Sequence, residues 1–323
     1  MKNIKTYYVT GCCGFIGSHL TRTLLEQGNY VIGVDKLTYA ARPKLVKEFR
    51  DEFEGRFEFI RGDINELQYL LEHDVFINTC AETHVGNSII NSKEFINSNT
   101  YGVYHILELL KNYRSETSQS PLFIHFSTDE VYGDIFEGAH KETDILKPSN
   151  PYSASKAAAD MLILAWARTY SIPYIIVRPT NNYGMGQNAE KLIPKVCKCL
   201  KFNKRIPLHN NGSPIRNWLH VSDTVNAIIT IINSNIKNDI FNINGNFERK
   251  NLDIVTEVIR LYKGVEGFYN PRNDLDLSYS RPGQDIRYAL DDSKLRKLGW
   301  DNKAVFEEEL EKIVKYNKAY HQW

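Results

Sequence analysis

The first half of the chain alternates short apolar runs with amphipathic segments. The apolar runs are rich in β-branched and aromatic residues, which is typical of buried strands; they cover residues 5–10, 30–35, 57–61, 75–79, 122–127 and 174–178. Between most of them, apolar residues recur at helical spacing, over residues 15–27, 67–71, 101–113 and 155–170. Strands that alternate with helices form a parallel sheet with helices on both faces. The pattern therefore predicts an α/β fold with a doubly wound parallel sheet.

The pattern changes after Pro179. Pro, Asn and Gly cluster over residues 181–186 and 210–214, and helical spacing recurs over residues 191–201, 222–233, 252–261 and 305–316. A further apolar run, residues 240–243, could return to the sheet. Because no low-complexity linker separates the halves, we expect two interleaved units. The first covers residues 1–178, with about 219–245 returning to it; a smaller C-terminal lobe covers residues 179–218 and 246–323.

Composition and charge exclude several classes of protein. The chain has 40 basic and 39 acidic residues, and a net charge of +1 attracts neither nucleic acid nor an anionic membrane. No apolar run approaches the roughly 18 residues of a membrane span, and the N-terminus does not resemble a targeting signal. Five cysteines without a signal favour free thiols in a reducing compartment. We expect a soluble cytoplasmic protein that binds no nucleic acid, no membrane and, since Cys197 and Cys199 lack partners at ligand spacing, no metal.

A glycine-rich loop, Gly-Cys-Cys-Gly-Phe-Ile-Gly over residues 11–17, joins the first predicted strand to the first helix. Glycines there allow a sharp turn, close approach of the backbone to a pyrophosphate, and tight packing of helix on strand. The phosphates would lie at the positive end of the helix. Asp35 ends the second strand, where a carboxylate binds both ribose hydroxyls of NAD and repels a 2′-phosphate. A structural turn with a surface Asp is the alternative, but the context favours a Rossmann-type fold that binds NAD.

Two groups of residues suggest acid–base chemistry. Tyr152 and Lys156 are four residues apart where a helix begins, so they share a face, and a nearby ammonium and a cationic nicotinamide would both favour a phenolate. Asp129 and Glu130 follow the fifth predicted strand, at the edge where the other strands end. Adjacent carboxylates beyond a buried strand suit the elimination of water from a carbon skeleton. The alternatives are a solvated Lys beside a helix-start Tyr, and an ordinary surface turn.

These motifs resemble the extended short-chain dehydrogenase/reductase family and, within it, the nucleotide-sugar 4,6-dehydratases. The resemblance covers nearly the whole chain and rests on residues 10–18, 34–40, 81–85, 127–134, 151–157, 178–184, 190–195, 216–219 and 281–285. The triplet Thr128, Asp129 and Glu130 is the discriminating motif. Relatives that do not dehydrate usually lack the Asp, and decarboxylases and GDP-mannose dehydratases tend to carry Ser there.

The resemblance implies a reaction sequence. Tyr152, helped by Thr128, would take the proton from the sugar 4-hydroxyl while the C4 hydride passes to NAD⁺. Glu130 would remove the C5 proton, and protonated Asp129 would donate to the leaving 6-hydroxyl before the hydride returns to C6. Lys156 would hold the nicotinamide ribose and lower the pKa of Tyr152. The product would be a nucleotide-linked 4-keto-6-deoxyglucose.

The same resemblance, together with the glycine loop, gives the expected binding residues. Cofactor contacts are expected from Gly11, Gly14, Phe15, Ile16, Gly17, Asp35, Lys36, Thr38, Asp63, Ile64, Ala81, Asn99, Ser127, Tyr152, Lys156 and Asn181. Contacts with the nucleotide-diphosphate sugar are expected from Thr83, His84, Thr128, Asn182, Lys191, Leu192, Pro207, His209, Arg216 and Arg281. An arginine fork pairs well with phosphate oxygens, although surface ion pairs are the alternative for the two arginines.

Departures from the family pattern leave the base of the nucleotide open. His209 stands where relatives commonly have Tyr, Gly86 replaces an Asp, Gln284 replaces a His, and Ala41 and Arg42 replace Gly-Asn. A thymine methyl group contributes only about 1 kcal/mol on burial. Both UDP-glucose and dTDP-glucose therefore remain candidate substrates.

Relatives pack the two helices predicted at residues 101–113 and 155–170 against their twofold mates, so the resemblance implies a homodimer. Two other functions remain alternatives. A nucleotide-sugar 4-epimerase would use the same Tyr152, Lys156 and NAD but would need no acid and base at C5 and C6. A non-catalytic NAD-binding sensor would have no need to retain all four reactive side chains.

Overall fold

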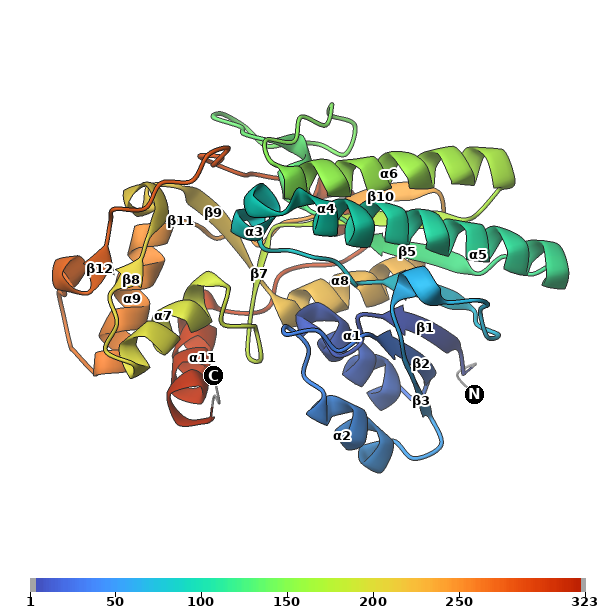
Figure 1. Cartoon of the computed structure of the whole chain (residues 1–323), viewed down its shortest axis with the longest axis horizontal. Helices are drawn as coiled ribbons and strands as arrows, with labels where there is room; N and C mark the ends of the chain where they lie inside the picture. Colours follow the sequence, from blue (N-terminus) through green and yellow to red (C-terminus); the bar gives the residue numbers. More distant parts are fainter. Residues whose placement is uncertain (1–3, 321–323) are drawn as a thin grey trace.

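The computed structural model describes residues 4–320 and has a seven-stranded parallel sheet at its centre (Figure 1). The order across the sheet is β10-β6-β5-β4-β1-β2-β3, and every neighbouring pair is parallel. The strands are β1 (Thr6–Thr10), β2 (Tyr30–Asp35), β3 (Phe57–Arg61), β4 (Val75–Asn78), β5 (Leu122–Phe126), β6 (Tyr174–Pro179) and β10 (Asp239–Ile243). The order reverses between β1 and β4, which creates a crevice at the carboxyl ends of these strands. The predicted Rossmann-type doubly wound fold is confirmed.

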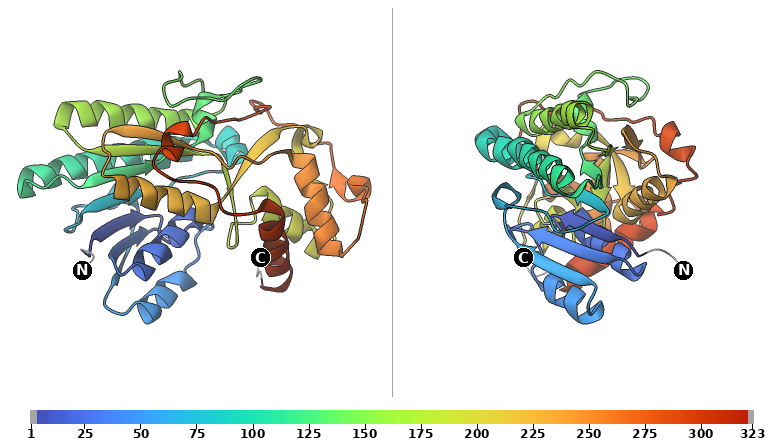
Figure 2. Two further views of the ribbon diagram at one scale, coloured as in Figure 1. Left: turned by 180° about the vertical axis from the view of Figure 1, so that it is seen from behind. Right: turned by 90° about the vertical axis from the view of Figure 1, so that its right-hand side faces the viewer.

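Helices cover both faces of the sheet because successive strand residues point to opposite sides. Tyr8 packs with α5 (Gly102–Thr117) and α6 (Pro151–Tyr170) on one face. Tyr7 and Val9 pack on the other face, which is covered by α1 (Phe15–Glu26), α2 (Lys44–Glu52) and α8 (Val221–Ser234). Figure 2 shows α5 and α6 side by side along the outside of the sheet. The strand apolar runs are thus buried on both sides, as in other parallel sheets.

The second lobe has its own apolar core, formed by residues such as Val196, Val258 and Leu310. Its helices are α7 (Leu192–Lys201), α9 (Asn251–Lys263) and α11 (Phe306–Tyr320), and its strands are β7 (Asn181–Tyr183), β8 (Ile206–Pro207), β9 (Ile215–His220), β11 (Glu248–Lys250) and β12 (Leu275–Asp276). Figure 1 shows these helices gathered beyond one end of the large sheet. The helix α8 and strand β10 lie between β9 and β11 in sequence, yet they belong to the large sheet and its cover. The predicted division into two interleaved units, with its limits, stays a prediction.

One predicted helix is wrong. Residues 67–71 do not form a helix; a 3₁₀ turn at Ile64–Glu66 precedes an extended segment, and Leu67 and Leu70 of that segment are buried in the core on the α5 and α6 side. Apolar residues do recur at helical spacing in this segment, but a run of five residues is too short to distinguish a helix from a buried extended segment. The sequence pattern also missed α2 and the short helices α3 (Val85–Ile90), α4 (Ser92–Phe95) and α10 (Ser293–Arg296).

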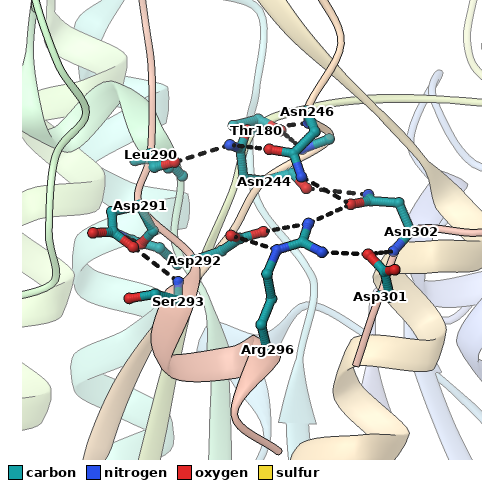
Figure 3. A network of polar contacts seen from close by, with 12 residues as sticks. Thr180, Asn244, Asn246, Leu290, Asp291, Asp292, Ser293, Arg296, Asp301 and Asn302 are labelled. Carbon is teal, nitrogen blue, oxygen red and sulfur yellow. Dashed lines mark hydrogen bonds and ion pairs between the residues drawn. The ribbon is translucent and has the colours of Figure 1, made fainter. Parts of the chain in front are cut away.

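A polar network joins the end of the large sheet to the chain that leads into α11 (Figure 3). Arg296 donates from Nε to Asp292 Oδ1 at 2.9 Å and from a terminal nitrogen to Asn302 Oδ1 at 2.7 Å. Asn302 Nδ2 donates to the carbonyl oxygen of Asn244, just after β10, at 3.1 Å. Asn244 in turn donates to the carbonyl oxygen of Leu290 at 2.9 Å. These contacts hold the chain that leads into α11 against the carboxyl end of β10.

Within residues 4–320, none of the helices is both long enough and apolar enough to cross a membrane.

Candidate active site

A cavity of about 300 Å³ lies where the strands of the large sheet end and the second lobe begins. All five predicted catalytic residues line it, as do all the predicted cofactor residues except Asn99. Among the predicted substrate residues, Thr83, Thr128, Asn182 and Lys191 line it. The structure thus places the glycine loop, the two carboxyl groups and the Tyr and Lys around one space.

The glycines of the loop are required by its packing. Gly11 has a φ of +73°, and a Cβ on it would lie 2.8 Å from the backbone nitrogen of Cys80. A Cβ on Gly17 would overlap the carbonyl oxygen of Gly11. Helix α1 can therefore start directly against β1 and β4, with its free N–H groups at the cavity wall. This arrangement fits a dinucleotide pyrophosphate.

Asp35 lies at the end of β2 and is fixed by the backbone. Its Oδ2 accepts from the backbone nitrogen of Cys13 at 2.9 Å, and its Oδ1 accepts from that of Leu37 at 2.8 Å. Potential ligand atoms of Cys12, Cys13 and Asp35 lie within 4.8 Å of one another. Both carboxylate oxygens already accept hydrogen bonds, and the hydrogen bond with Cys13, followed by burial, raises the pKa of Cys12. We therefore retain the expectation of no metal as a prediction.

Asp129 is held as a buried carboxyl group with one free oxygen. It begins the 3₁₀ helix Asp129–Tyr132 after β5, and Thr128 Oγ1 donates to its Oδ1 at 3.0 Å. Its Oδ2 is buried and has no partner among the described residues. Burial raises the pKa of Asp129 to about 7, and the neighbouring Glu130 carboxylate adds to the rise. A group with this pKa is a proton donor near neutral pH.

Glu130 is partly buried, and burial raises its pKa, while Arg216 and Arg281 oppose the rise. Tyr288 donates from its hydroxyl to Glu130 Oε2 at 3.4 Å, and the same hydroxyl is hydrogen-bonded to Asp285. Glu130 can thus ionise between two cationic groups, as a general base must.

Tyr152 and Lys156 lie in the first turns of α6, which begins with a capping box formed by Asn150 and Ser153. Burial, followed by the charge of Glu130, raises the pKa of Tyr152, while a hydrogen bond with Thr128 opposes the rise. Lys156 Nζ donates to the carbonyl oxygen of residue 126 at 2.6 Å. Burial thus dominates the pKa of Tyr152 in the protein alone, and the expected lowering by Lys156 stays a prediction.

Residues from the second lobe complete the surroundings of Glu130. Arg216 is only 6% exposed, and its guanidinium lies 4.3 Å from the centre of the Tyr288 ring. Arg216 donates to the carbonyl oxygen of Asp285 at 2.9 Å. It therefore does not form the surface ion pair that was the alternative for this residue. Lys191 Nζ donates to both the carbonyl oxygen and Oγ1 of Thr83 at 2.9 Å.

The remaining predicted residues lie outside the cavity lining. Asn99 is buried and bridges Glu82 to Ser155, which is a structural contact; its predicted cofactor contact stays a prediction. His84 caps α3 by accepting from the backbone nitrogen of Asn87 at 3.0 Å. The other residues in this group belong to the second lobe: Leu192, Pro207, His209, Arg216 and Arg281.

The residues that depart from the family pattern also have defined positions. Gln284 accepts a hydrogen bond from Arg281, and Arg42 donates to Ser18 at the start of α1. A Cβ on Gly86 would lie 3.0 Å from the ring of His84. The ring of His209 lies 5.9 Å from that of Tyr279, edge to face.

Several lining or supporting residues were missed by the sequence analysis. Glu190 and Gln187 line the cavity, Tyr39 donates to Glu190 at 2.7 Å, and Asp285 and Tyr288 support Glu130. Asp285 lies within a motif that was recognised, so its position was available as a signal. Tyr39 and Glu190 also lie within recognised motifs, residues 34–40 and 190–195, whereas Gln187 and Tyr288 lie outside them.

Comparison with known proteins agrees with this geometry. The family profile described as GDP-mannose 4,6 dehydratase matches residues 8–313. The dTDP-glucose 4,6-dehydratase of Haemophilus influenzae is 38% identical, over 95% of this chain and 96% of its own length. A trifunctional UDP-glucose 4,6-dehydratase/UDP-4-keto-6-deoxy-D-glucose 3,5-epimerase/UDP-4-keto-L-rhamnose-reductase of Arabidopsis thaliana is 37% identical, over 99% of this chain and 48% of its own length. The structure of a dTDP-glucose 4,6-dehydratase from Streptomyces venezuelae, solved with NAD bound, superposes with a TM-score of 0.89 at 31% identity and covers 97% of both chains. The chain therefore belongs to the GDP-mannose 4,6 dehydratase family, together with these dTDP-glucose and UDP-glucose 4,6-dehydratases.

Proposed function

We propose that this chain is an NAD-dependent nucleotide-sugar 4,6-dehydratase, which converts UDP-glucose or dTDP-glucose to the nucleotide-linked 4-keto-6-deoxyglucose. The observation that carries the proposal is Asp129, a carboxyl group with a pKa of about 7 whose free Oδ2 belongs to a cavity-lining residue. It lies beside Glu130 and shares the cavity with Tyr152 and the glycine loop. A 4-epimerase would have no use for this pair of carboxyl groups.

The cofactor that fits the glycine loop and Asp35 is NAD. When bound, NAD accepts a hydride from C4 of the hexose and returns it to C6, so it is regenerated in each turnover. Among the chain's own residues, the loop would hold the pyrophosphate, Asp35 the ribose hydroxyls, and Lys156 the nicotinamide ribose.

The side chains of the site divide the proton transfers between them. Tyr152 accepts the proton of the 4-hydroxyl, and Thr128 lines the same cavity. Glu130 removes the C5 proton, which the 4-keto group acidifies, and Asp129 donates its proton from Oδ2 to the leaving 6-hydroxyl. Arg216, Arg281 and Lys191 supply the positive charge for the diphosphate.

The direct test is incubation of the purified protein with UDP-glucose and, separately, with dTDP-glucose. We expect a product that has lost one water and that absorbs in alkali as a 4-keto sugar. The ratio of the two rates gives the base preference, which the position of His209 leaves open. A product of unchanged mass that contains galactose would replace the dehydratase by an epimerase.

Asp35 gives a prediction about the cofactor. We expect the protein to bind NADH at least tenfold, or about 1.4 kcal/mol, more tightly than NADPH, because the fixed carboxylate repels a 2′-phosphate. Titration of cofactor-depleted protein measures both affinities, and Asp35→Ser should narrow the difference. Asp51→Ser, which changes an exposed residue of α2, is the matched control. Equal affinity of the unaltered protein for the two cofactors would contradict the role of Asp35.

A homodimer is part of the proposal. Tyr101, Met161 and Tyr170 are 49%, 48% and 39% exposed on or beside α5 and α6, and these helices would pack against their twofold mates. Sedimentation should give twice the chain mass, and Met161→Glu should shift the protein towards a monomer, because it would bury a charge. Ile145→Glu, at a residue that is 76% exposed elsewhere, should not. A monomeric unaltered protein would exclude this interface.

We also keep the cytoplasmic location as a proposal, which rests on the free cysteines.

A further inference from the structure

A row of buried polar side chains lies beneath Lys156, near the carboxyl ends of three central strands of the large sheet. Thr10, Asn78 and His125 are neighbours in register on β1, β4 and β5, and each is at most 1% exposed. Thr10 Oγ1 donates to Asn78 Oδ1 at 2.6 Å, Asn78 Nδ2 lies 3.1 Å from His125 Nδ1, and Lys156 Nζ lies 3.2 Å from His125 Nε2. Polar groups in the centre of a parallel sheet are costly, so a row that leads to a proposed catalytic residue calls for a functional explanation.

The hydrogen-bond donors and acceptors of this row can be paired in two ways. An amide nitrogen only donates, and a neutral imidazole has one donor and one acceptor. If Asn78 donates to His125 Nδ1, the ring hydrogen is on Nε2, and Lys156 must be an uncharged amine to accept it. If Lys156 is an ammonium that donates to Nε2, the ring hydrogen is on Nδ1, and Asn78 must present its oxygen to the ring. Its nitrogen then faces Thr10 and Cys80, both of which can accept.

The charges around the row allow both arrangements near neutral pH. Burial lowers the pKa of Lys156 to about 8, while Asp160, one turn further along α6, and Cys80, just after β4, oppose that shift. Burial, and then the charge of Lys156, lower the pKa of His125, so the imidazole stays neutral. Tyr152 is the other titratable group on this face of α6. In both arrangements Lys156 keeps its bond to the carbonyl oxygen of residue 126.

We propose that His125 is a positioning residue for Lys156, and that its ring hydrogen moves between Nε2 and Nδ1 as Lys156 gains and loses its proton. His125 thereby accepts from the ammonium and donates to the amine, so Lys156 Nζ remains in place below the cavity in both states. Asn78 selects the tautomer by turning its amide. The inference rests on the proposed function only for the importance of Lys156; the switch itself is a property of the buried row.

The first experiment uses the unaltered protein. Nitrogen NMR of ¹⁵N-histidine-labelled protein should show a neutral His125 whose protonated nitrogen changes from Nδ1 to Nε2 as the pH rises through the titration of Lys156. Loss of the signals in His125→Gln assigns them. A single tautomer throughout that titration would overturn the proposal. Because this readout needs no substrate, it is independent of whether the protein dehydrates a nucleotide sugar.

The second experiment measures the titration of Lys156 itself by ¹³C NMR of labelled lysine, assigned with Lys156→Arg. His125→Phe removes the partner of Lys156 in both states, but the hydrogen bond from the ammonium is charge-assisted and is the stronger of the two. The pKa of Lys156 should therefore fall by about one unit, a tenfold change in its protonation equilibrium. His125→Gln should return the pKa of Lys156 most of the way to its value in the unaltered protein, because an amide can offer either its oxygen or its nitrogen. A folded His125→Phe protein with unchanged Lys156 titration would mean that His125 only fills space. Thermal unfolding of both variants records any loss of stability separately.

Discussion

Replacing Glu130 by Gln should stop proton exchange at C5 while hydride transfer from C4 survives. Gln has nearly the same shape but cannot accept a proton, so the reaction should halt after the first oxidation. A lost general base lowers kcat by about 10² to 10⁴-fold. Absorbance of the reduced cofactor and wash-in of deuterium from solvent at C5 measure the two steps separately.

The matched control is Glu137→Gln, which makes the same change at an exposed residue a few positions further along the chain. It should turn over at the normal rate. Full turnover by Glu130→Gln would remove Glu130 as the base. The base would then have to be sought among the neighbouring carboxyl groups, and Asp285, which shares Tyr288 with Glu130, would be the first candidate.

Much of the site was predictable because parallel strands end at one edge of their sheet. Asp35 ends a strand that the apolar pattern identified, and the glycine loop, Asp63 and the triplet 128–130 each follow one. The alternation of strands and helices places all those ends together. The helical spacing of Tyr152 and Lys156 likewise needed no tertiary information.

What the sequence could not provide was register and burial. Asn78 and His125 lie side by side only because β4 and β5 pair in one particular register, and neither residue stands out in the chain. The raised pKa of Tyr152 follows from how deeply α6 packs, which the motif does not encode. Tyr288, which is hydrogen-bonded to Glu130, lies 158 positions further along the sequence. Such contacts are set by the packing of the two lobes.

Asp129→Asn should remove the proton donor for the leaving 6-hydroxyl. An amide cannot protonate the departing oxygen, so kcat should fall by about 10² to 10⁴-fold. Exchange at C5 should persist, because Glu130 remains in place. Measuring overall turnover and C5 exchange on the same protein distinguishes this result from that of Glu130→Gln. Asp51→Asn, an exposed change on α2, should leave both unaffected.

The pH dependence of the dehydration step is a second test of Asp129 as the acid. The acid must be protonated, and burial followed by the charge of Glu130 raises the pKa of Asp129 to about 7, so the dehydration step should weaken as the pH rises through about 7. Asp129→Asn should lose this limb of the profile of kcat against pH. Glu130→Gln should move the titration of Asp129 to lower pH, because it removes a charge that disfavours the carboxylate, and ¹³C NMR of labelled aspartate would record that shift without turnover. If the limb persists in Asp129→Asn, another group is the acid, and the free Oδ2 of Asp129 has a different purpose.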